Sequence, residues 1–467
     1  MNRESLLPHL GEFAAKMAKA GLRPLVLDTF AHYYRKLASG ATGLIHDADI
    51  QPVAPAEIPN FSALAGYAPA GERLLPRTVR IVLNGGLGTS MGLIGPKSLL
   101  KVKQGRSFLE IILRQAELTN SRLALMNSFN THTATLAALE RLKPARMPLC
   151  FLQHKFPKVL QGSLRPASWP ANRELEWNPP GHGDVYAALH ASGMLQSLLN
   201  DGVRFAFICN SDNLGANIDE ALLGYFGEKG LPFMMEVAEK TPADVKGGHL
   251  ARQRGGRLVL RESAQCPKED IAAFEDIRRY RYFNTNNIWI NLDFLKEFIR
   301  RHRIVELPMI VNPKPLDPRN AASPPVYQIE TAMGSAISLI EGAAAVNVPR
   351  ARFLPVKTCN DLLAVRSDCF VYSEREGLKI NPARTAGGRS ERIKIRLDPA
   401  YYGKFDLLEQ RFAHGEPSLV ACDELTVQGD VHFEKEVVIR GAVTITHSGG
   451  EPGRIRSGTV VEGDLAL

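Results

Sequence analysis

Apolar and polar residues follow different rhythms in successive parts of the chain. In the first 50 residues, Leu6, Leu10, Phe13 and Met17 recur at helical spacing, which predicts helices. Residues 51–77 are rich in proline, alanine and glycine and read as a connector. We therefore expect residues 1–77 to form an N-terminal helical segment with a connector.

From residue 78 to 374, short apolar runs alternate with amphipathic segments. The apolar runs predict strands that end in polar or glycine-rich turns: RIVLNGG, SRLALMNSF, MPLCFLQH, RFAFICNSD and PFMMEVAEK. Helices are predicted between some of them, over 107–117, 132–142, 184–199 and 329–341, with Asp184 at an N-cap. This alternation predicts an α/β domain with a mixed, mainly parallel sheet and helices on its faces.

The rhythm changes again near residue 375. ELTVQGDVHFEKEVVIRGAVTITHSGG and SGTVVEGDLAL alternate apolar and polar residues at period two, with glycine turns and no helix signal. Rungs of a β-solenoid would suit this pattern, although no strict repeat period is present. Residues 375–467 are predicted to form a C-terminal β-rich domain.

Composition removes several classes of protein. The 467 residues are 45% hydrophobic and 23% charged, which excludes disorder, and no apolar run reaches the ~20 residues of a membrane span. The first residues lack the apolar core of a signal peptide, so secretion is not expected. Six cysteines without a C-x-x-C pair indicate a reduced, cytoplasmic protein. The net charge of +8 suits nucleic acid, an anionic membrane or a small polyanion, or only solubility.

The first candidate for chemistry is the stretch RIVLNGGLGTSMGLIGPKSLL at 80–100. Glycines let a backbone approach an anion with its N–H groups inward, and a lysine adds a point charge for phosphate. Neither familiar phosphate motif fits, because Met91 stands where the dinucleotide fingerprint needs glycine and Pro96 precedes the lysine. The loop still predicts phosphate binding through these residues: Gly85, Gly86, Gly88, Gly92, Gly95 and Lys97.

The second candidate is FAFICNSDN, an apolar strand that ends in Asn210, Asp212 and Asn213. Ligands bind at the carboxyl ends of strands in open α/β sheets, and Mg²⁺ prefers one or two carboxylates plus phosphate oxygens. Asp212 is thus a candidate metal ligand, with a turn or cap role as the alternative. His182 in PPGHGD, ahead of a predicted helix, is a candidate anion contact, although lone histidines are more often structural.

Taken together, the motifs resemble those of the UTP–glucose-1-phosphate uridylyltransferases, also called UDP-glucose pyrophosphorylases. The resemblance runs from about residue 80 to 445. It rests on the glycine loop and on further stretches in family order: LMNSFNT, FLQHKFPKV, PPGHGDVY, FICNSDNLGA, MEVAEKTPADVKGGHL, FNTNNIWINL, NVPRARFLPVKT and LTVQGDVHF. It implies a Rossmann-like, GT-A-like nucleotidyltransferase fold with a left-handed β-helix-like C-terminal domain.

The resemblance also implies site residues, carried onto the matching positions. Lys97 and Lys357 would be the catalytic lysines that meet the phosphates, and Asp212 would hold Mg²⁺. The nucleotide would contact Leu83, Asn84, Gly85, Gly86, Lys97, Gln153, Gly181 and Asp212, with Gln153 reading the uracil edge. The sugar phosphate would contact His182, Asn210, Ser211, Gly248, Glu262, Asn284, Asn286 and Lys357.

The implied reaction is reversible, Mg²⁺-dependent transfer of a uridylyl group from UTP to glucose 1-phosphate. Three alternatives stay open: an enzyme for galactose or N-acetylhexosamine 1-phosphate, a non-catalytic nucleotide-binding protein, and a nucleic-acid-binding protein. The last would need dense basic clusters with aromatic residues, and FEDIRRYRYF at 274–283 is only one short segment. We expect no nucleic-acid or membrane partner, and assembly into a homo-oligomer through the C-terminal domain.

Overall fold

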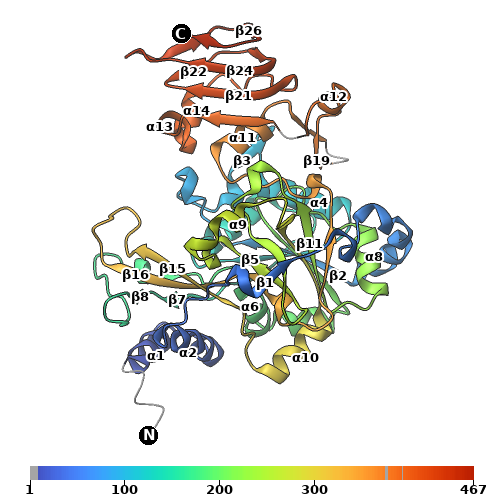
Figure 1. Cartoon of the computed structure of the whole chain (residues 1–467), viewed down its shortest axis with the longest axis vertical. Coiled ribbons are helices and arrows are strands. Elements are labelled where there is room, and N and C mark those ends of the chain that lie inside the picture. Colours follow the sequence, from blue (N-terminus) through green and yellow to red (C-terminus); the bar gives the residue numbers. More distant parts are fainter. Residues whose placement is uncertain (1–8, 374–376, 392) are drawn as a thin grey trace.

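The computed structural model describes residues 9–373, 377–391 and 393–467. Figure 1 shows a large central body, a pair of helices at the end near the N-terminus, and a stack of short strands at the opposite end. Leu6, one of the residues used to predict the first helix, lies outside the described residues.

The N-terminal helices are α1 (Leu10–Lys19) and α2 (Pro24–Ala38). They pack through aromatic rings: the Phe13 centroid lies 4.9 Å from Phe30 and 4.7 Å from Tyr34. Phe30 also contacts Phe156 of the central body, with 5.4 Å between ring centroids. The apolar stripe seen in the sequence therefore attaches this helix pair to the body.

The predicted connector at 51–77 holds more structure than its composition suggests. It includes most of strand β1 (Ile50–Pro52) and helix α3 (Ala68–Leu74), which packs against α8 (Glu220–Glu228). The two helices approach closely, since a Cβ on Gly71 would lie 1.8 Å from the Glu220 carbonyl oxygen. Glycine and alanine here serve helix packing instead of a flexible link.

A mixed sheet forms the central body. Its main path is β1-β12-β14-β10-β2-β5-β6, and β11, β13 and β17 pair at its sides. Beyond β1, the strands are β2 (Thr78–Asn84), β5 (Arg122–Asn127), β6 (Leu149–Leu152), β10 (Phe205–Asn210), β11 (Phe233–Glu239), β12 (His249–Gln253), β13 (Leu258–Arg261), β14 (Tyr282–Asn291) and β17 (Ala344–Asn347). The neighbours β6, β5, β2 and β10 are parallel, as are β11 and β17. Strand β14 runs antiparallel to β10, β11 and β12. The predicted mixed α/β class is confirmed.

Helices cover the sheet, and two predicted ones differ from expectation. Besides α8, they are α4 (Phe108–Leu118), α5 (His132–Leu142), α6 (Val185–Ala191), α7 (Met194–Asn200), α9 (Ile271–Glu275) and α10 (Leu292–His302). Helix α11 (Cys359–Arg366) packs instead toward the C-terminal domain. The helix predicted over 184–199 is divided into α6 and α7, because Gly193 adopts a left-handed φ of 82°. The helix predicted over 329–341 was wrong. Strand β16 (Pro325–Thr331) continues to Thr331, and only a short 3₁₀ helix, Met333–Ser338, follows.

Tertiary pairing explains that error. Ile329, Met333, Ala336 and Ile340 have helical spacing and are all buried. Ile329, however, pairs with Val311 of β15 (Met309–Pro315) in an antiparallel ribbon that β8 (Val159–Leu160) completes. The apolar residues of one helical pattern thus belong to two different elements.

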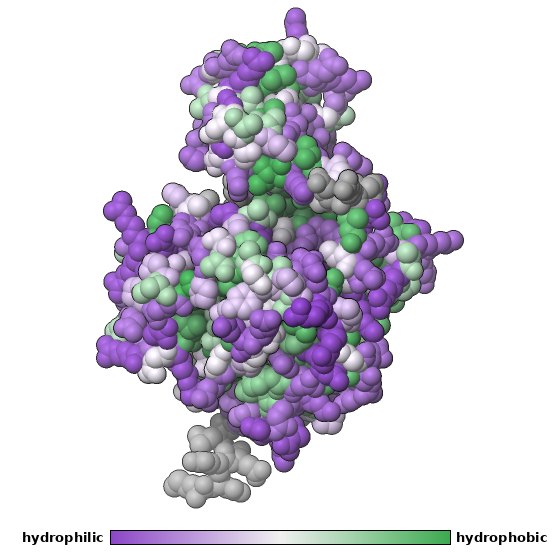
Figure 2. All heavy atoms as spheres, turned by 90° about the vertical axis from the view of Figure 1, so that its right-hand side faces the viewer, coloured by the Kyte–Doolittle hydropathy of each residue, from purple (hydrophilic) through white to green (hydrophobic). Residues whose placement is uncertain are grey.

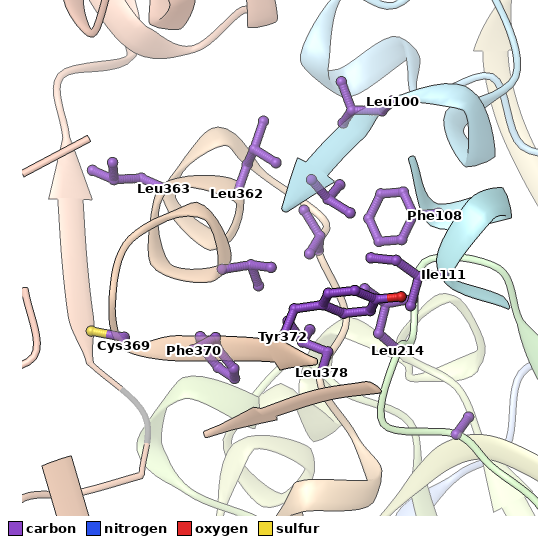
Figure 3. Packing of buried hydrophobic residues seen from close by; sticks show 14 of the residues in the cluster. Leu100, Phe108, Ile111, Leu214, Leu362, Leu363, Cys369, Phe370, Tyr372 and Leu378 are labelled. Atoms are coloured by element: carbon purple, nitrogen blue, oxygen red, sulfur yellow. The ribbon is translucent and has the colours of Figure 1, made fainter. Parts of the chain in front are cut away.

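Short hairpins and helices connect the body to the C-terminal domain. They are β3 (Lys101–Lys103), β4 (Arg106–Ser107), β18 (Phe370–Ser373), β19 (Gly377–Ile380), α12 (Pro382–Ala386), α13 (Pro399–Tyr402) and α14 (Phe405–Arg411). A further hairpin of β7 (Phe156–Pro157) and β9 (Trp177–Asn178) lies at the N-terminal end, where β7 contacts α1. Figure 3 shows Tyr372 and Leu378 of the β18–β19 hairpin beside Phe108 and Ile111 of α4. One hydrophobic cluster runs from the central sheet into the C-terminal domain. In Figure 2 that domain forms a separate lobe with green, apolar residues near its base.

The C-terminal domain is built from short parallel sheets. They are β20-β21-β24-β27, β22–β25 and β23–β26. The strands are β20 (Lys394–Leu397), β21 (Cys422–Gln428), β22 (Val431–Phe433), β23 (Val438–Ile439), β24 (Gly441–Thr446), β25 (Gly453–Ile455), β26 (Val460–Val461) and β27 (Leu465–Ala466). This is the stacking of a β-solenoid. Leu425 pairs with Val443, 18 residues on, but Val431 pairs with Gly453, 22 residues on. Rungs of unequal length explain why the sequence has no strict period.

Candidate active site

The glycine-rich loop leaves the carboxyl end of β2, in the parallel part of the sheet. Gly88 and Gly92 have φ values of 64° and 75°, which side chains other than glycine rarely adopt. The N–H of Lys97 donates to the carbonyl oxygen of Gly86 at 3.0 Å and closes the loop. The loop is thus a closed turn with two left-handed glycines, and its binding of phosphate stays a prediction.

Lys97 and Asp212 meet where the β2 loop and the end of β10 come together. The Lys97 Nζ donates to Asp212 Oδ2 at 2.6 Å, and the two side chains are 12% and 16% exposed. The other carboxylate oxygen, Oδ1, is buried and has no hydrogen-bond partner among the described residues. Two oppositely charged candidates that the sequence placed far apart are therefore direct neighbours.

That unpartnered oxygen allows a test of the expected Mg²⁺ site. A buried carboxylate oxygen without a donor is suited to a cation, and Mg²⁺ accepts one or two protein carboxylates when phosphate oxygens fill other positions. Among the described residues, no group of three or more His, Cys, Asp or Glu is arranged to hold a metal. Asp212 therefore fits a metal bound jointly with a phosphate ligand.

Gln153 and Gly181 form the next wall, beyond β6. The Gln153 Nε2 donates to the Gly181 carbonyl oxygen at 2.7 Å. Gly181 has a φ of 77°, and a Cβ there would lie 2.3 Å from the carbonyl oxygen of Thr331. A Cβ on Gly85 would lie 2.9 Å from Gln153 Oε1. Gly85 therefore keeps space around the amide that is expected to read the base, while Gly181 allows the backbone to lie close to Thr331.

His182 follows this wall and has a defined hydrogen-bond role. Its Nδ1 lies 3.1 Å from the backbone N of Met333 and accepts that N–H. Burial, with the nearby charge of Lys357 as a smaller cause, lowers the pKa of His182 to about 4. The ring is therefore neutral at pH 7 and carries its proton on Nε2, where it can donate to an anionic oxygen.

Asp184 has a different partner from the one expected. It stands at the N-cap of α6 but makes no side-chain cap hydrogen bond. Its carboxylate instead accepts from the backbone N of His154 at 2.7 Å and lies 2.8 Å from His154 Nδ1. Asp184 thus fixes the residue next to Gln153.

A cavity of about 310 Å³ opens on the antiparallel side of the sheet. It collects the residues that the resemblance assigns to the hexose, together with Lys357: Gly248, Glu262, Asn284, Asn286 and Lys357. Asn286 is brought in by a bulge in β14, where it has a φ of 58°. The Asn284 Nδ2 donates to Asn286 Oδ1 at 2.8 Å, so the two amides orient each other.

The Glu262 carboxylate lies directly against Gly248 in the lining of this cavity. A Cβ on Gly248 would lie 2.3 Å from Glu262 Oε2, so only glycine leaves the carboxylate in place. Burial raises the pKa of Glu262, while the charge of Lys357 and a hydrogen bond with Asn284 oppose that rise. The carboxylate therefore lies within electrostatic reach of the second candidate lysine.

Lys357 reaches the cavity from the segment before α11. Its side chain is exposed, and its Nζ lies 5.7 Å from the centroid of the Phe353 ring. The Asp361 Oδ2 accepts from the backbone N of Lys357 at 3.0 Å and from that of Thr358 at 2.9 Å. The capping box of α11 thus anchors the backbone from which Lys357 extends.

Three predicted residues are buried and use polar groups within the protein. The Asn84 Nδ2 donates to Asn127 Oδ1 at 2.7 Å and to Thr135 Oγ1 at 3.0 Å. Leu83 and Ser211 are buried and joined by a backbone hydrogen bond of 3.2 Å. The Asn84 amide is used inside the protein, while Asn210 is half-buried at the end of β10.

Sequence reasoning also missed residues that line the cavity: Asp244, Lys246, Gly247, Phe283, Phe353, Pro355 and Asp361. Arg350 lies behind them. Its Nη1 lies 2.9 Å from Asp244 Oδ2, and its guanidinium lies 4.8 Å from the Phe283 ring centroid.

No helix in the described part of the chain has the length and apolarity to cross a membrane.

Comparisons with known proteins identify relatives of this chain. The family model of UTP–glucose-1-phosphate uridylyltransferase matches residues 27–440. The UTP–glucose-1-phosphate uridylyltransferase of Saccharomyces cerevisiae is 39% identical over 447 residues, covering 93% of this chain and 87% of the relative. That of Hordeum vulgare is 40% identical over 402 residues, covering 84% and 82%.

Solved structures extend the likeness to the whole fold. A mutant of UDP-glucose pyrophosphorylase from Leishmania major, in complex with UDP-glucose, has a TM-score of 0.90 at 40% identity and covers 98% of this chain and 99% of its own. A UDP-glucose phosphorylase from Trypanosoma brucei has a TM-score of 0.87 at 41% identity, with the same coverage. The chain therefore belongs to the UTP–glucose-1-phosphate uridylyltransferase family.

Proposed function

We propose that this protein transfers a uridylyl group from UTP to glucose 1-phosphate, reversibly, giving UDP-glucose and pyrophosphate. The observation that carries the proposal is the meeting of the Lys97–Asp212 pair, 2.6 Å apart, with a glycine loop, beside a cavity lined by Glu262 and Lys357. One side suits a polyphosphate and the other a hydroxyl-rich ring. Family membership supports the same substrates.

The chemistry needs alignment and charge neutralisation more than proton transfer. The phosphate oxygen of the sugar is already an anion, so it can attack the α-phosphorus without a general base. The loop N–H groups and Lys97 would hold the triphosphate and the departing pyrophosphate, while Lys357 would orient the attacking phosphate. His182, neutral with its proton on Nε2, would donate to a phosphate oxygen.

Mg²⁺ remains part of the proposal. Asp212 would hold it through the buried oxygen that has no partner among the described residues. When bound, the ion neutralises phosphate charge. The protein's share is a fixed carboxylate, with Lys97 on the opposite oxygen.

Base choice and sugar choice are proposed to rest on different walls. Gln153 offers a donor and an acceptor to the base, and its Nε2 is oriented by the Gly181 carbonyl oxygen. Glu262, Asn284 and Asn286 offer acceptors and donors to sugar hydroxyls. Release of pyrophosphate should therefore be greatest with UTP and glucose 1-phosphate.

A matrix of substrates tests this proposal. UTP, ATP and GTP are each combined with glucose, galactose and N-acetylglucosamine 1-phosphate, with and without Mg²⁺, and pyrophosphate is measured. A higher kcat/KM with galactose or N-acetylglucosamine 1-phosphate would show that this sugar phosphate, and not glucose 1-phosphate, is the preferred substrate. Tight UTP binding without turnover on any sugar would instead indicate a non-catalytic nucleotide-binding protein.

Location and assembly complete the proposal. Among the described residues all six cysteines are free, and four of them are buried, which supports a reducing cytoplasm. The last strand of the solenoid, β27, pairs on one edge with β24, so the other edge supports association through the C-terminal domain. Light scattering of the purified chain, with and without residues 441–467, would measure the oligomeric state.

A further inference from the structure

Asn213 is a buried residue next to Asp212 whose side chain lines no described cavity. Its Oδ1 accepts from the backbone N of Leu354 at 2.8 Å and from that of Gly215 at 3.2 Å. Its Nδ2 donates to the carbonyl oxygen of Arg352 at 3.0 Å. A single side chain thus bonds to two points of the segment that leads to Lys357.

The backbone continues this connection. Asn213 and Pro355 form an isolated antiparallel bridge, and the N–H of Val356 donates to the carbonyl oxygen of Asp212 at 3.1 Å. Lys357 is the next residue. The turn that carries the metal-site carboxylate and the segment that carries the second lysine are therefore joined directly, although they lie far apart in the sequence.

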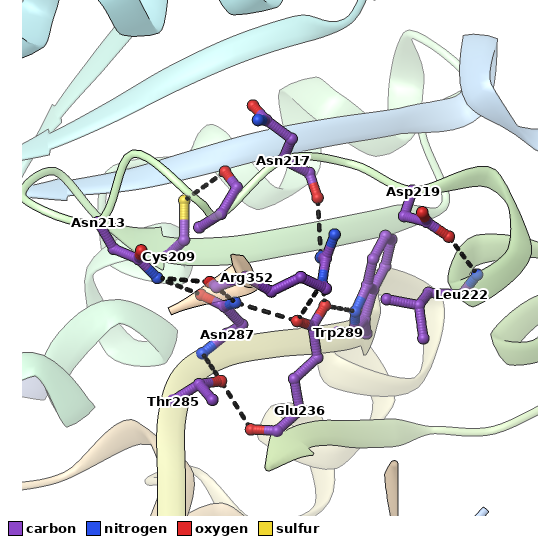
Figure 4. A network of polar contacts seen from close by, with 11 residues as sticks. Cys209, Asn213, Asn217, Asp219, Leu222, Glu236, Thr285, Asn287, Trp289 and Arg352 are labelled. Carbon is purple, nitrogen blue, oxygen red and sulfur yellow. Dashed lines mark hydrogen bonds and ion pairs between the residues drawn. The ribbon is translucent and has the colours of Figure 1, made fainter. Parts of the chain in front are cut away.

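Arg352 gives this segment a rigid base. Its Nε and Nη2 donate to the two carboxylate oxygens of Glu236, each at 2.7 Å, and Glu236 is 0% exposed. Trp289 Nε1 donates to the same carboxylate at 2.9 Å. Figure 4 shows Asn213 reaching toward Arg352 and Asn287, with Glu236 between Arg352 and Trp289. A buried, bidentate pair of this kind holds one geometry.

From this geometry we infer that Asn213 is a positioning residue, which sets the place of Lys357 relative to Asp212. The inference rests on the proposed function for its catalytic consequence. A shift of ~1 Å in a reacting group can reduce turnover by roughly 100-fold. Asn213 is therefore expected to affect kcat although it does not touch substrate.

The main experiment is a double-mutant cycle with Asn213→Ala and Lys357→Ala, measured at saturating UTP and sugar phosphate. Asn213→Ala should lower kcat by about 10- to 100-fold and change the KM for UTP by less than about threefold. In the Lys357→Ala background the same substitution should lower kcat by less than about threefold, because the group it positions is gone. Multiplicative losses in the double variant would overturn the inference, as would a wild-type kcat in Asn213→Ala.

Trp289→Phe is the matched control. It removes a hydrogen bond from the same buried carboxylate but leaves the bonds of Asn213 to Leu354 and Arg352 intact. It should lower the melting temperature and keep kcat within about threefold of the parent, since it does not release the Lys357 segment. An equal loss of kcat in Trp289→Phe would mean that the role of Asn213 is only structural.

Two further measurements keep the test decisive. Asn213→Asp retains the acceptor for Leu354 but sets an oxygen against the carbonyl oxygen of Arg352, so its kcat should fall at least as far as that of Asn213→Ala. Amide exchange at Leu354 and Val356 should accelerate in Asn213→Ala and not in Trp289→Phe, whatever the reaction is. Unchanged amide exchange at Leu354 and Val356 would refute the proposal that Asn213 holds the Lys357 segment in place. A parent protein without turnover would refute only the proposed function.

Discussion

The two halves of the site differ in how the chain builds them. The phosphate half lies at the carboxyl ends of the parallel strands β2, β5, β6 and β10. The cavity half lies beside antiparallel strands and the segment before α11, and it collects residues from several distant stretches. Parallel strands bring their loops to one edge automatically, whereas the cavity depends on a bulge, a capping box and a buried ion pair.

This difference explains where charge and glycine are used. In the phosphate half, Lys97 and Asp212 pair directly, and Gly88 and Gly92 of the loop adopt left-handed conformations. In the cavity half, Lys357 is exposed and its place depends on Asn213 and Asp361. The phosphate half is thus defined by a local sequence motif, whereas the cavity half depends on buried residues that hold its lining in place.

The largest effect is expected from the phosphate half. Lys97→Ala removes the ammonium that pairs with Asp212 and that we propose meets the phosphates, so kcat should fall by roughly 100- to 1,000-fold, about 3–4 kcal/mol of transition-state stabilisation. Lys101→Ala is the control, because Lys101 is 55% exposed and pairs with Glu110 on the surface. Equal kcat values for parent and Lys97→Ala would contradict the assigned role.

Acid should destabilise the protein through a buried histidine beside the cavity half. His249 on β12 is buried, stacks 3.9 Å from the Tyr280 ring centroid, and its ring nitrogens have no partner among the described residues. Burial, followed by the charges of Lys240 and Arg261, lowers the pKa of His249 to about 2. Below pH ~6.5 the His249 imidazole is protonated in the unfolded chain but stays neutral in the folded chain. The free energy of unfolding therefore decreases as the pH falls.

His249→Phe should remove this sensitivity while keeping the ring stack. Between pH 7 and 5 the parent should lose about 2 kcal/mol more unfolding free energy than the variant, by urea denaturation. His46→Gln, at an exposed histidine, is the control. Parallel pH profiles for parent and His249→Phe would show that His249 is protonated in the folded state as readily as in the unfolded chain.

Gly248→Ala tests the cavity wall. The new Cβ would lie 2.3 Å from Glu262 Oε2 and displace the carboxylate. The KM for glucose 1-phosphate should rise by about tenfold, roughly 1.4 kcal/mol, with the KM for UTP nearly unchanged. Gly255→Ala, where a Cβ meets nothing within 4 Å, should leave both constants unaltered. A larger rise in the KM for UTP than in the KM for glucose 1-phosphate would contradict the assignment of Gly248 to the sugar-binding cavity.

Gly85→Ala is the corresponding test of the nucleotide wall, and it should have the smallest effect of these variants. Its Cβ would lie 2.9 Å from Gln153 Oε1, the end of a side chain that can move. The KM for UTP should rise by about fivefold, roughly 1 kcal/mol, while that for the sugar phosphate stays constant. Gly162→Ala, again with open space, is the control. If both KM values rose together, the two halves would not be separable.

Much of the fold followed from local pattern, and the exceptions have definite causes. The strand ending at Asn84 and the strand ending at Asn210 were predicted because their apolar runs are short and bounded by turns. The 329–341 helix failed because pairing of Ile329 with Val311 overrides helical spacing. The solenoid rungs lacked a period because successive registers differ by several residues.

The sequence by itself determined the family, the glycine loop, and the chemical identity of Lys97, Asp212 and Lys357, because residue types and their local order are written in the chain. Only the tertiary structure decided that Lys97 bonds to Asp212, that Asn84 turns inward, and that Asn213 joins the Lys357 segment to the Asp212 turn. Those contacts connect stretches that are remote in sequence. Their geometry is set by sheet register and by the cost of burying polar groups without partners, neither of which a local pattern encodes.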